Sequence, residues 1–188
     1  MIIDIFKTGV YFKECNIDLQ PIKDYCLHYS QNNPSRNNSN IGGYQSNDLL
    51  LQDNETFKPL YDEISKEINL YAKDMCLKDQ VIDNAWFNIN EYKDSNMSHT
   101  HPVSPISGVF YVSVPEDGGD IVFERSDQIL IDYAWYNKNN NYNPYNSTNW
   151  TLSAKDNYLY LFPSFLNHRV SPNQNKELKR ISISFNCL

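Results

Sequence analysis

Apolar residues along this chain recur at two different spacings. Between residues 57 and 75 they return every three or four positions, which predicts one long helix with a single buried face. Residues 22–29 repeat this spacing over a shorter stretch and predict a second helix. Residues 1–16 instead alternate between apolar and polar side chains around Thr8-Gly9, which predicts strand in this opening segment.

The pattern changes after Val81. Short stretches rich in aromatic and β-branched residues are separated there by turn-forming segments, and each stretch predicts a strand. The predicted strands are residues 85–90, 107–114, 120–124, 158–162 and 180–186. Two polar, asparagine-rich segments, 31–47 and 136–149, predict surface loops. Helices followed by a run of strands indicate an α+β fold, mainly β, with a sandwich or open barrel of the jelly-roll kind.

No internal repeat and no shift in composition divides the 188 residues. This length suits one domain and is enough to bury a core without disulfides or a structural metal. We therefore expect a single domain over residues 1–188, with an N-terminal strand and helices in 1–80 and the β core in 81–188.

Charge and composition narrow the classes of partner. With 16 Lys and Arg against 23 Asp and Glu, the net charge of −7 disfavours binding to duplex nucleic acid or to an anionic membrane. No apolar run approaches the ~20 residues that span a bilayer. The four cysteines lie far apart and the N-terminus has no basic leader, which favours a cytoplasmic protein with reduced thiols.

Three of the four histidines fall in positions that suit a metal site. His99 and His101 are separated by one residue, so in an extended segment both side chains leave the same face and can reach one ion. His168 follows a predicted strand and turn much later in the chain, and two near ligands with one remote ligand commonly build a metal site on a β scaffold. The alternative is that these are ordinary surface histidines at a chance spacing.

The last predicted strand carries a second candidate site. Residues 180–186 alternate strictly between a polar face, which begins Arg180-x-Ser182, and an apolar face of Ile and Phe. The arginine offers a fork of donors and the serine adds a hydroxyl, a combination that suits a carboxylate. An exposed edge strand with ordinary polar residues would explain the same pattern without a ligand.

Taken together, the histidines and the strands around them closely resemble the small 2-oxoglutarate/Fe(II)-dependent oxygenases of phages and bacteria. The matching strings are residues 99–112 (HTHPVSPISGVFYV), 115–119 (PEDGG), 121–123 (IVF), 161–172 (LFPSFLNHRVSP) and 180–186 (RISISFN). Residues 5–11 are similar to the start of that family, so the resemblance covers nearly the whole chain. It implies a double-stranded β-helix (jelly-roll) core with the N-terminal helices packed on one sheet, and one Fe(II) at its mouth.

By this resemblance, His99 and His168 match the two histidines that hold iron in the superfamily. His101 stands where the superfamily usually has a carboxylate. Either His101 completes a three-histidine site, or it lies outside the ligand set and an acid comes from elsewhere. Strand geometry favours His101, and the nearby acids that would replace it are Asp94, Asp120 and Glu124.

The same resemblance assigns a co-substrate site. Arg180 would pair with the distal carboxylate of 2-oxoglutarate, with help from Ser182. Tyr111 is a further candidate contact, although one of fourteen tyrosines can equally be a packing residue in the sheet. Asn88 and Asn90, on the preceding strand, are weaker candidates. Oxidative decarboxylation of this small-molecule co-substrate would give succinate and carbon dioxide and lead to hydroxylation of a second substrate.

Two segments depart from the family pattern. Residues 124–127 read Glu-Arg-Ser-Asp where family members commonly carry Asp-Pro-Arg, so Arg125 would be an imperfect substitute if that arginine binds substrate. The segment 126–150 includes an insertion rich in Tyr and Trp, residues 132–150, which the family pattern does not predict. We expect this insertion to shape a different substrate pocket.

Two other protein classes share parts of this pattern. Cupins have a similar barrel and a His-x-His, but they usually place a glutamate four or five residues after the second histidine, and His101 is followed by Pro-Val-Ser-Pro-Ile-Ser. A non-catalytic jelly roll, such as a carbohydrate-binding or virion structural module, would use its aromatic residues as a binding platform and leave the histidines incidental. Metal content separates this last class from the two enzyme classes.

Overall fold

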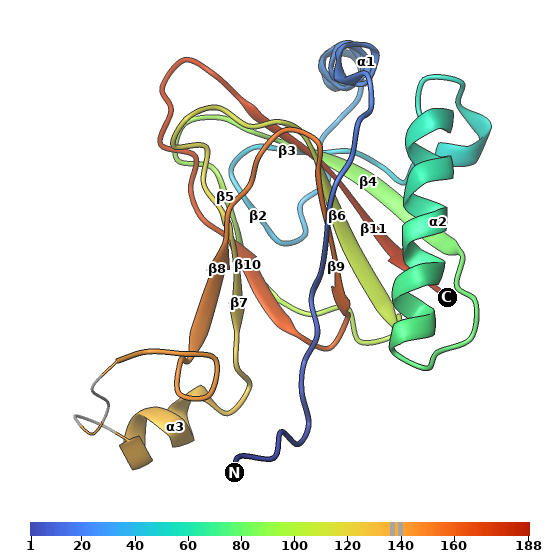
Figure 1. Ribbon diagram of the computed structural model, residues 1–188. Coiled ribbons are helices and arrows are strands. Elements are labelled where there is room, and N and C mark those ends of the chain that lie inside the picture. Colours follow the sequence, from blue (N-terminus) through green and yellow to red (C-terminus); the bar gives the residue numbers. More distant parts are fainter. Residues whose placement is uncertain (136–137, 139–140) are drawn as a thin grey trace.

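The computed structural model describes residues 1–135, 138 and 141–188 as two antiparallel sheets and three α-helices (Figure 1). The larger sheet has the strand order β1 (Tyr11–Glu14), β9 (Tyr158–Pro163), β6 (Ile106–Ser113), β11 (Arg180–Cys187), β4 (Ile82–Asn90), β3 (Tyr44–Gln45). The smaller sheet has the order β2 (Asn40–Ile41), β5 (Ser95–His99), β10 (Asn167–Val170), β7 (Ile121–Glu124), β8 (Asn149–Leu152). The fold is therefore mainly β, as the sequence predicts.

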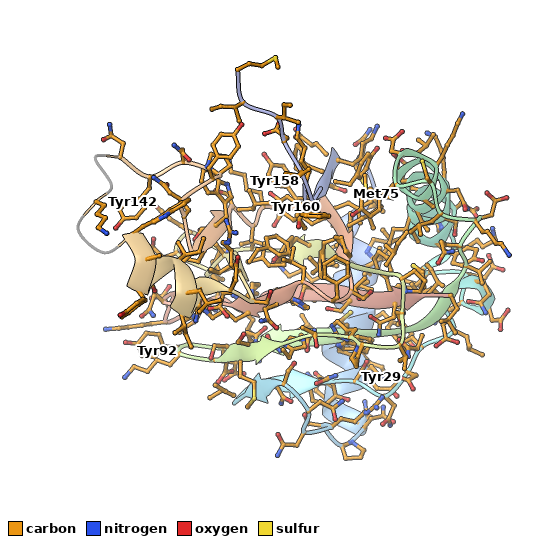
Figure 2. The ribbon with its side chains drawn as sticks, turned by 90° about the horizontal axis from the view of Figure 1, so that it is seen from below. Tyr29, Met75, Tyr92, Tyr142, Tyr158 and Tyr160 are labelled. Carbon is orange, nitrogen blue, oxygen red and sulfur yellow. The ribbon has the colours of Figure 1, made fainter. Side chains whose placement is uncertain are left out.

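Apolar side chains from both sheets meet between them. Val109 and Tyr111 of β6 pack in one cluster with Phe123 of β7. Tyr160 of β9 belongs to the same cluster, and Figure 2 shows it beside Tyr158 of the same strand. The two sheets thus enclose a common interior, in the manner of packed sheets.

Two helices cover the outer face of the larger sheet: α1 (Leu19–Asn32) and α2 (Lys58–Asp74), with the 3-10 turn η1 (Leu51–Asp53) before α2. Both match predicted helices. α1 begins earlier than its apolar stripe because the side chain of Asp18 accepts a hydrogen bond from the backbone N–H of Gln20 and caps the first turn. The apolar stripes of both helices pack in one cluster with the sheet, and burial of this apolar surface stabilises the layer.

The strict alternation of β11 places this strand between two different layers. Ile181 and Ile183 point into the cluster under the helices. Ser182 and Ser184 point the other way and line a pocket between the sheets. The polar face predicted from the sequence is therefore an interior face, not an exposed edge, because β11 is paired on both sides by β4 and β6.

Several strands differ from the predicted set. Only Tyr11–Glu14 of the opening sixteen residues forms a strand, so the prediction of strand over 1–16 is wrong for most of that segment. β5 and β10 were not predicted, because their sequences, SNMSH and NHRV, are largely polar and show no apolar alternation. Both are held in the sheet by pairing with each other.

The insertion between β7 and β8 contains more structure than a loop. It includes α3 (Gln128–Trp135), none of whose residues is buried, and it rejoins the smaller sheet as β8. Figure 1 shows α3 standing away from both sheets, and Figure 2 shows Tyr142, which follows it, on the same outlying part. Residues 136, 137, 139 and 140 of the predicted loop 136–149 lie outside the described residues.

No helix in the described ranges is long and apolar enough to cross a membrane. All four cysteines are free thiols, and three of them are buried. Packing and hydrogen bonds, not disulfides, therefore hold the two sheets together.

Candidate metal centre

The three predicted histidines converge at one point of the smaller sheet. His99 ends β5 and lies directly opposite His168 of β10 in the antiparallel pairing. His101 lies beyond the end of β5, in a loop fixed by a hydrogen bond from its backbone N–H to the carbonyl of Ser164 at 2.9 Å. Ligand atoms of the three imidazoles all lie within 4.8 Å of one another. The site is therefore assembled by the pairing of β5 with β10 and by the loop that contains His101, and the expected placement of His99 and His101 on one strand is not what brings them together.

Two of the imidazoles are oriented by the backbone. Nδ1 of His99 lies 2.7 Å from the carbonyl oxygen of Met97, and Nδ1 of His168 lies 2.9 Å from that of Leu166. A carbonyl only accepts, so each Nδ1 carries the proton and donates it. This leaves Nε2 of both rings as a free lone pair, the arrangement in which histidine binds metals.

Burial keeps these imidazoles neutral. Removal from water and, to a smaller extent, the neighbouring ring of His99 lower the pKa of His168 to about 3 and that of His101 to about 4. Burial also lowers the pKa of His99. Lowered values mean that the charged imidazolium is disfavoured near neutral pH. All three rings then offer a lone pair to a cation.

None of the acids considered as an alternative ligand joins the histidines in the described part of the chain. The carboxylate of Asp94 accepts from the backbone N–H of Glu91, and that of Asp120 accepts from the backbone N–H of Ala154. Glu124 accepts from Ser98 and from Arg169 instead. Each acid is thus engaged in holding local structure.

A pocket between the sheets connects the histidines with the side chains of Tyr111 and Ser182. Two residues before Ser182 along β11, and more deeply buried, lies Arg180, which is only 1% exposed. Its Nη1 donates to the carbonyls of Gly118 at 2.6 Å and Ser171 at 2.9 Å. Its Nε and Nη2 have no partner, nor does the buried hydroxyl of Tyr111.

The absence of a counter-charge makes the region around Arg180 a candidate anion site. No carboxylate among the described residues forms an ion pair with Arg180. A buried cation without a partner is costly, and the two unpaired N–H groups form the fork that a carboxylate accepts in bidentate fashion. Burial raises the pKa of Tyr111, so its hydroxyl stays protonated and can add a third donor.

The turn 115–119 holds Arg180 in place, and Gly119 is essential to it. Gly119 has φ +84°, and a Cβ there would collide with the carbonyl oxygen of Ser171 and lie 2.7 Å from Nη1 of Arg180. Gly119→Ala is expected to lower the free energy of unfolding by about 1–3 kcal/mol and to weaken anion binding by displacing the guanidinium. Urea unfolding measures the first effect and calorimetric titration with 2-oxoglutarate the second.

The matched control for this substitution is Gly9→Ala. A Cβ at Gly9 would lie 3.4 Å from Cε of Met75, which is an ordinary contact, so its stability and anion affinity should stay near those of the parent. Equal effects of the two substitutions would show that the turn does not position Arg180.

One residue considered in the sequence analysis lies outside the pocket, and two residues that line the pocket were not predicted. Arg125 is paired with Asp127 at 2.8 Å near the surface, and it does not line the pocket. Trp86 and Asn96 do line it, and no pattern in the sequence singled them out. A buried aromatic or amide is unremarkable in a strand until its neighbours are known.

Three neutral imidazoles beside an unpaired buried arginine have the donors of a mononuclear metal site next to an anion site. Residues 84–186 match the sequence profile of the family described as "Putative 2OG-Fe(II) oxygenase". This match spans more than half of the chain, and the chain belongs to that family. It is therefore a 2-oxoglutarate/Fe(II)-dependent oxygenase whose cofactors are Fe(II) and 2-oxoglutarate, which confirms the resemblance and decides against the cupin and non-catalytic alternatives.

Several solved structures share this fold. The carbocyclase SnoK from nogalamycin biosynthesis is 10% identical, with 96% of this chain and 79% of that chain covered and a TM-score of 0.69. A prolyl-4-hydroxylase from Pseudomonas putida is 13% identical, with coverage of 95% and 92% and a TM-score of 0.62. The viral collagen prolyl hydroxylase vCPH from Paramecium Bursaria Chlorella virus-1 is 10% identical, with coverage of 95% and 94% and a TM-score of 0.59. At identities this low, the structural similarity shows a shared fold and nothing more. No curated protein matches the sequence.

Proposed function

We propose that this oxygenase hydroxylates a second substrate and releases succinate and carbon dioxide, with His99, His101 and His168 as the iron ligands. The observation that carries this proposal is the convergence of three neutral imidazoles in a pocket that also leads to a buried arginine with two unpaired N–H groups. When bound, Fe(II) supplies coordination of the 2-oxo acid and activation of dioxygen.

The protein's own groups provide orientation and charge. The carbonyls of Met97 and Leu166 fix two rings so that Nε2 faces the metal position. Three neutral ligands leave the full charge of a divalent cation uncompensated, which favours a dianionic co-substrate over a neutral one. The ligand set of three imidazoles, with no carboxylate among them, fits Fe(II), for which imidazole is a suitable ligand.

Arg180, Tyr111 and Ser182 are the residues proposed to bind 2-oxoglutarate. Arg180 would donate Nε and Nη2 to the distal carboxylate, and the hydroxyls of Tyr111 and Ser182 would donate to the same group. Tyr111 and Ser182 lie opposite each other in the pairing of β6 and β11, so both reach one position. A carboxylate bound here would accept from Nε and Nη2 of Arg180 and from the hydroxyl of Tyr111, which are the unpaired donors on these residues.

We further propose that the sheets form a double-stranded β-helix within one domain over 1–188, with residues 1–80 packed on the core in 81–188. The support is the order of the strands: β4, β6, β9 and β11 belong to one sheet, and β5, β7, β8 and β10 belong to the other. Nearly every connection thus crosses from sheet to sheet, as in jelly rolls. Free thiols at all four cysteines favour the cytoplasm as its location.

Turnover without substrate tests the function. Protein loaded anaerobically with Fe(II) and then exposed to air with 2-oxoglutarate should form succinate slowly, detectable by mass spectrometry, because co-substrate and dioxygen sites are complete without the second substrate. Omission of iron or 2-oxoglutarate should abolish the signal. Absence of succinate from the loaded protein, with or without candidate substrates, would contradict the proposal.

A further inference from the structure

Part of the pocket lining, contributed by both sheets, is built differently from the region around Arg180, which lies beyond the lining residues. Nδ2 of Asn88 donates to Oγ of Ser184 at 3.3 Å across β4 and β11. On the smaller sheet, Nδ2 of Asn96 donates to Oγ of Ser39 at the same distance. All four residues line the pocket together with Trp86. We call these five residues, Ser39, Trp86, Asn88, Asn96 and Ser184, the amide wall.

Asn88 leaves an acceptor without a partner. Its side chain is 4% exposed, and its Oδ1 has no hydrogen bond. A buried carbonyl oxygen that lacks a donor destabilises the protein unless a ligand or water supplies that donor, and Asn88 is among the residues that line the pocket. The unmet requirement of this wall is therefore an N–H or O–H group.

2-Oxoglutarate cannot meet this requirement. Its two carboxylates and its keto oxygen are acceptors, which suits the donors of Arg180 and Tyr111 but not Oδ1 of Asn88. The hydroxyls of Ser39 and Ser184 already accept from asparagine, and each retains a hydrogen to donate. The wall thus combines donors and an acceptor, whereas the deep end offers donors.

The wall also lacks charge and lies beside the proposed iron ligands. No Asp, Glu, Lys or Arg side chain lines the pocket within the described residues. The ring of Trp86 lies 5.8 Å, centroid to centroid, from that of His101 and gives the wall a flat apolar surface. A charged ligand group placed here would lose hydration without gaining a partner.

We infer that the amide wall binds the substrate, and that the substrate presents to it an uncharged planar group that both donates and accepts hydrogen bonds, as a carboxamide does. This inference rests on the proposed function, since it assigns the wall to the substrate of the same iron site. Asn88 is its central contact, because it is the wall residue with a buried unpaired acceptor. Hydrogen-bonding groups of this kind discriminate strongly among ligands of equal shape.

Four aromatic probes of similar shape test the inference. Benzamide is neutral and has a donor, methyl benzoate is neutral without one, benzoate is an anion, and benzylammonium is a cation. We would measure their binding by ligand-observed NMR to protein loaded with Zn(II) and 2-oxoglutarate, in which no turnover occurs. Benzamide should bind at least tenfold more tightly than each of the others.

Two variants of Asn88 make the test specific. Asn88→Leu removes the acceptor and should weaken benzamide at least tenfold, and Asn88→Asp should shift the preference towards benzylammonium. Asn32→Leu, at the end of α1 and outside the pocket, is the control for an added leucine. Thermal unfolding and a calorimetric titration with 2-oxoglutarate on each protein verify folding and an intact co-substrate site.

The outcomes separate this inference from the proposed function. If 2-oxoglutarate still binds, either of two results would overturn the inference. One is that benzamide binds the parent protein no better than methyl benzoate does, and the other is that benzamide binds Asn88→Leu as tightly as the parent. Failure of 2-oxoglutarate to bind the metal-loaded parent protein would instead remove the proposed function, and the inference with it.

Discussion

Replacing His168 with alanine is expected to abolish both metal binding and the conversion of 2-oxoglutarate to succinate. His168 is the ligand candidate that joins the site from the far part of the chain, where it lies opposite His99 in the pairing of β10 with β5. Without it, two imidazoles remain, too few to fix the position of an ion. Loss of a supporting hydrogen bond around a metal typically lowers affinity about 10–100-fold, so loss of a ligand should lower it by about 100-fold or more.

Titration with Co(II), followed by visible absorption, measures metal affinity directly, and succinate is measured in parallel. His168 contacts the core through Phe162, whose ring centroid lies 4.7 Å away, so the alanine variant should lose about 1–2 kcal/mol of stability and still fold. His28→Ala is the matched control, because His28 is exposed on α1 and lies outside the histidine group. A His168→Ala protein with the parent's Co(II) affinity would rule out His168 as a ligand.

The second large effect is expected at Arg180. Arg180→Lys keeps the positive charge but replaces a planar fork with a single ammonium group. In the parent, Nη1 is engaged by the carbonyls of Gly118 and Ser171, which leaves Nε and Nη2 for the ligand. One lysine nitrogen cannot reproduce both sets of contacts. The affinity for 2-oxoglutarate should therefore fall roughly tenfold or more, equivalent to ~1.5–3 kcal/mol for hydrogen bonds to a charged group.

Isothermal titration of Zn(II)-loaded protein with 2-oxoglutarate measures this change without turnover. Arg169→Lys is the matched control, because Arg169 is partly exposed and pairs with Glu124 at 2.8 Å outside the pocket. That variant should bind 2-oxoglutarate as the parent does, since a surface ion pair contributes little. Equal affinities of Arg180→Lys and the parent would exclude Arg180 from the co-substrate site.

Local sequence patterns were reliable where a single element faces two unlike layers. The stripe in residues 57–75 predicted α2, because one side of that helix packs on the larger sheet and the other faces water. The alternation in 180–186 predicted β11 and its polar face, because one face of this strand packs under the helices and the other lines the pocket between the sheets. The same reasoning failed for β5 and β10, whose residues meet a polar pocket and a partly exposed surface and so lack an apolar rhythm.

The sequence by itself determined the types of chemistry available: three histidines at suggestive spacings, and an arginine followed two residues later by a serine on a strand. Only the tertiary structure decided how they combine. It placed His99 opposite His168, engaged Asp120 and Glu124 elsewhere, and left two nitrogens of Arg180 unpaired. The physical reason is that alternation along a strand specifies which face a side chain occupies, whereas the register between distant strands depends on packing of the whole interior.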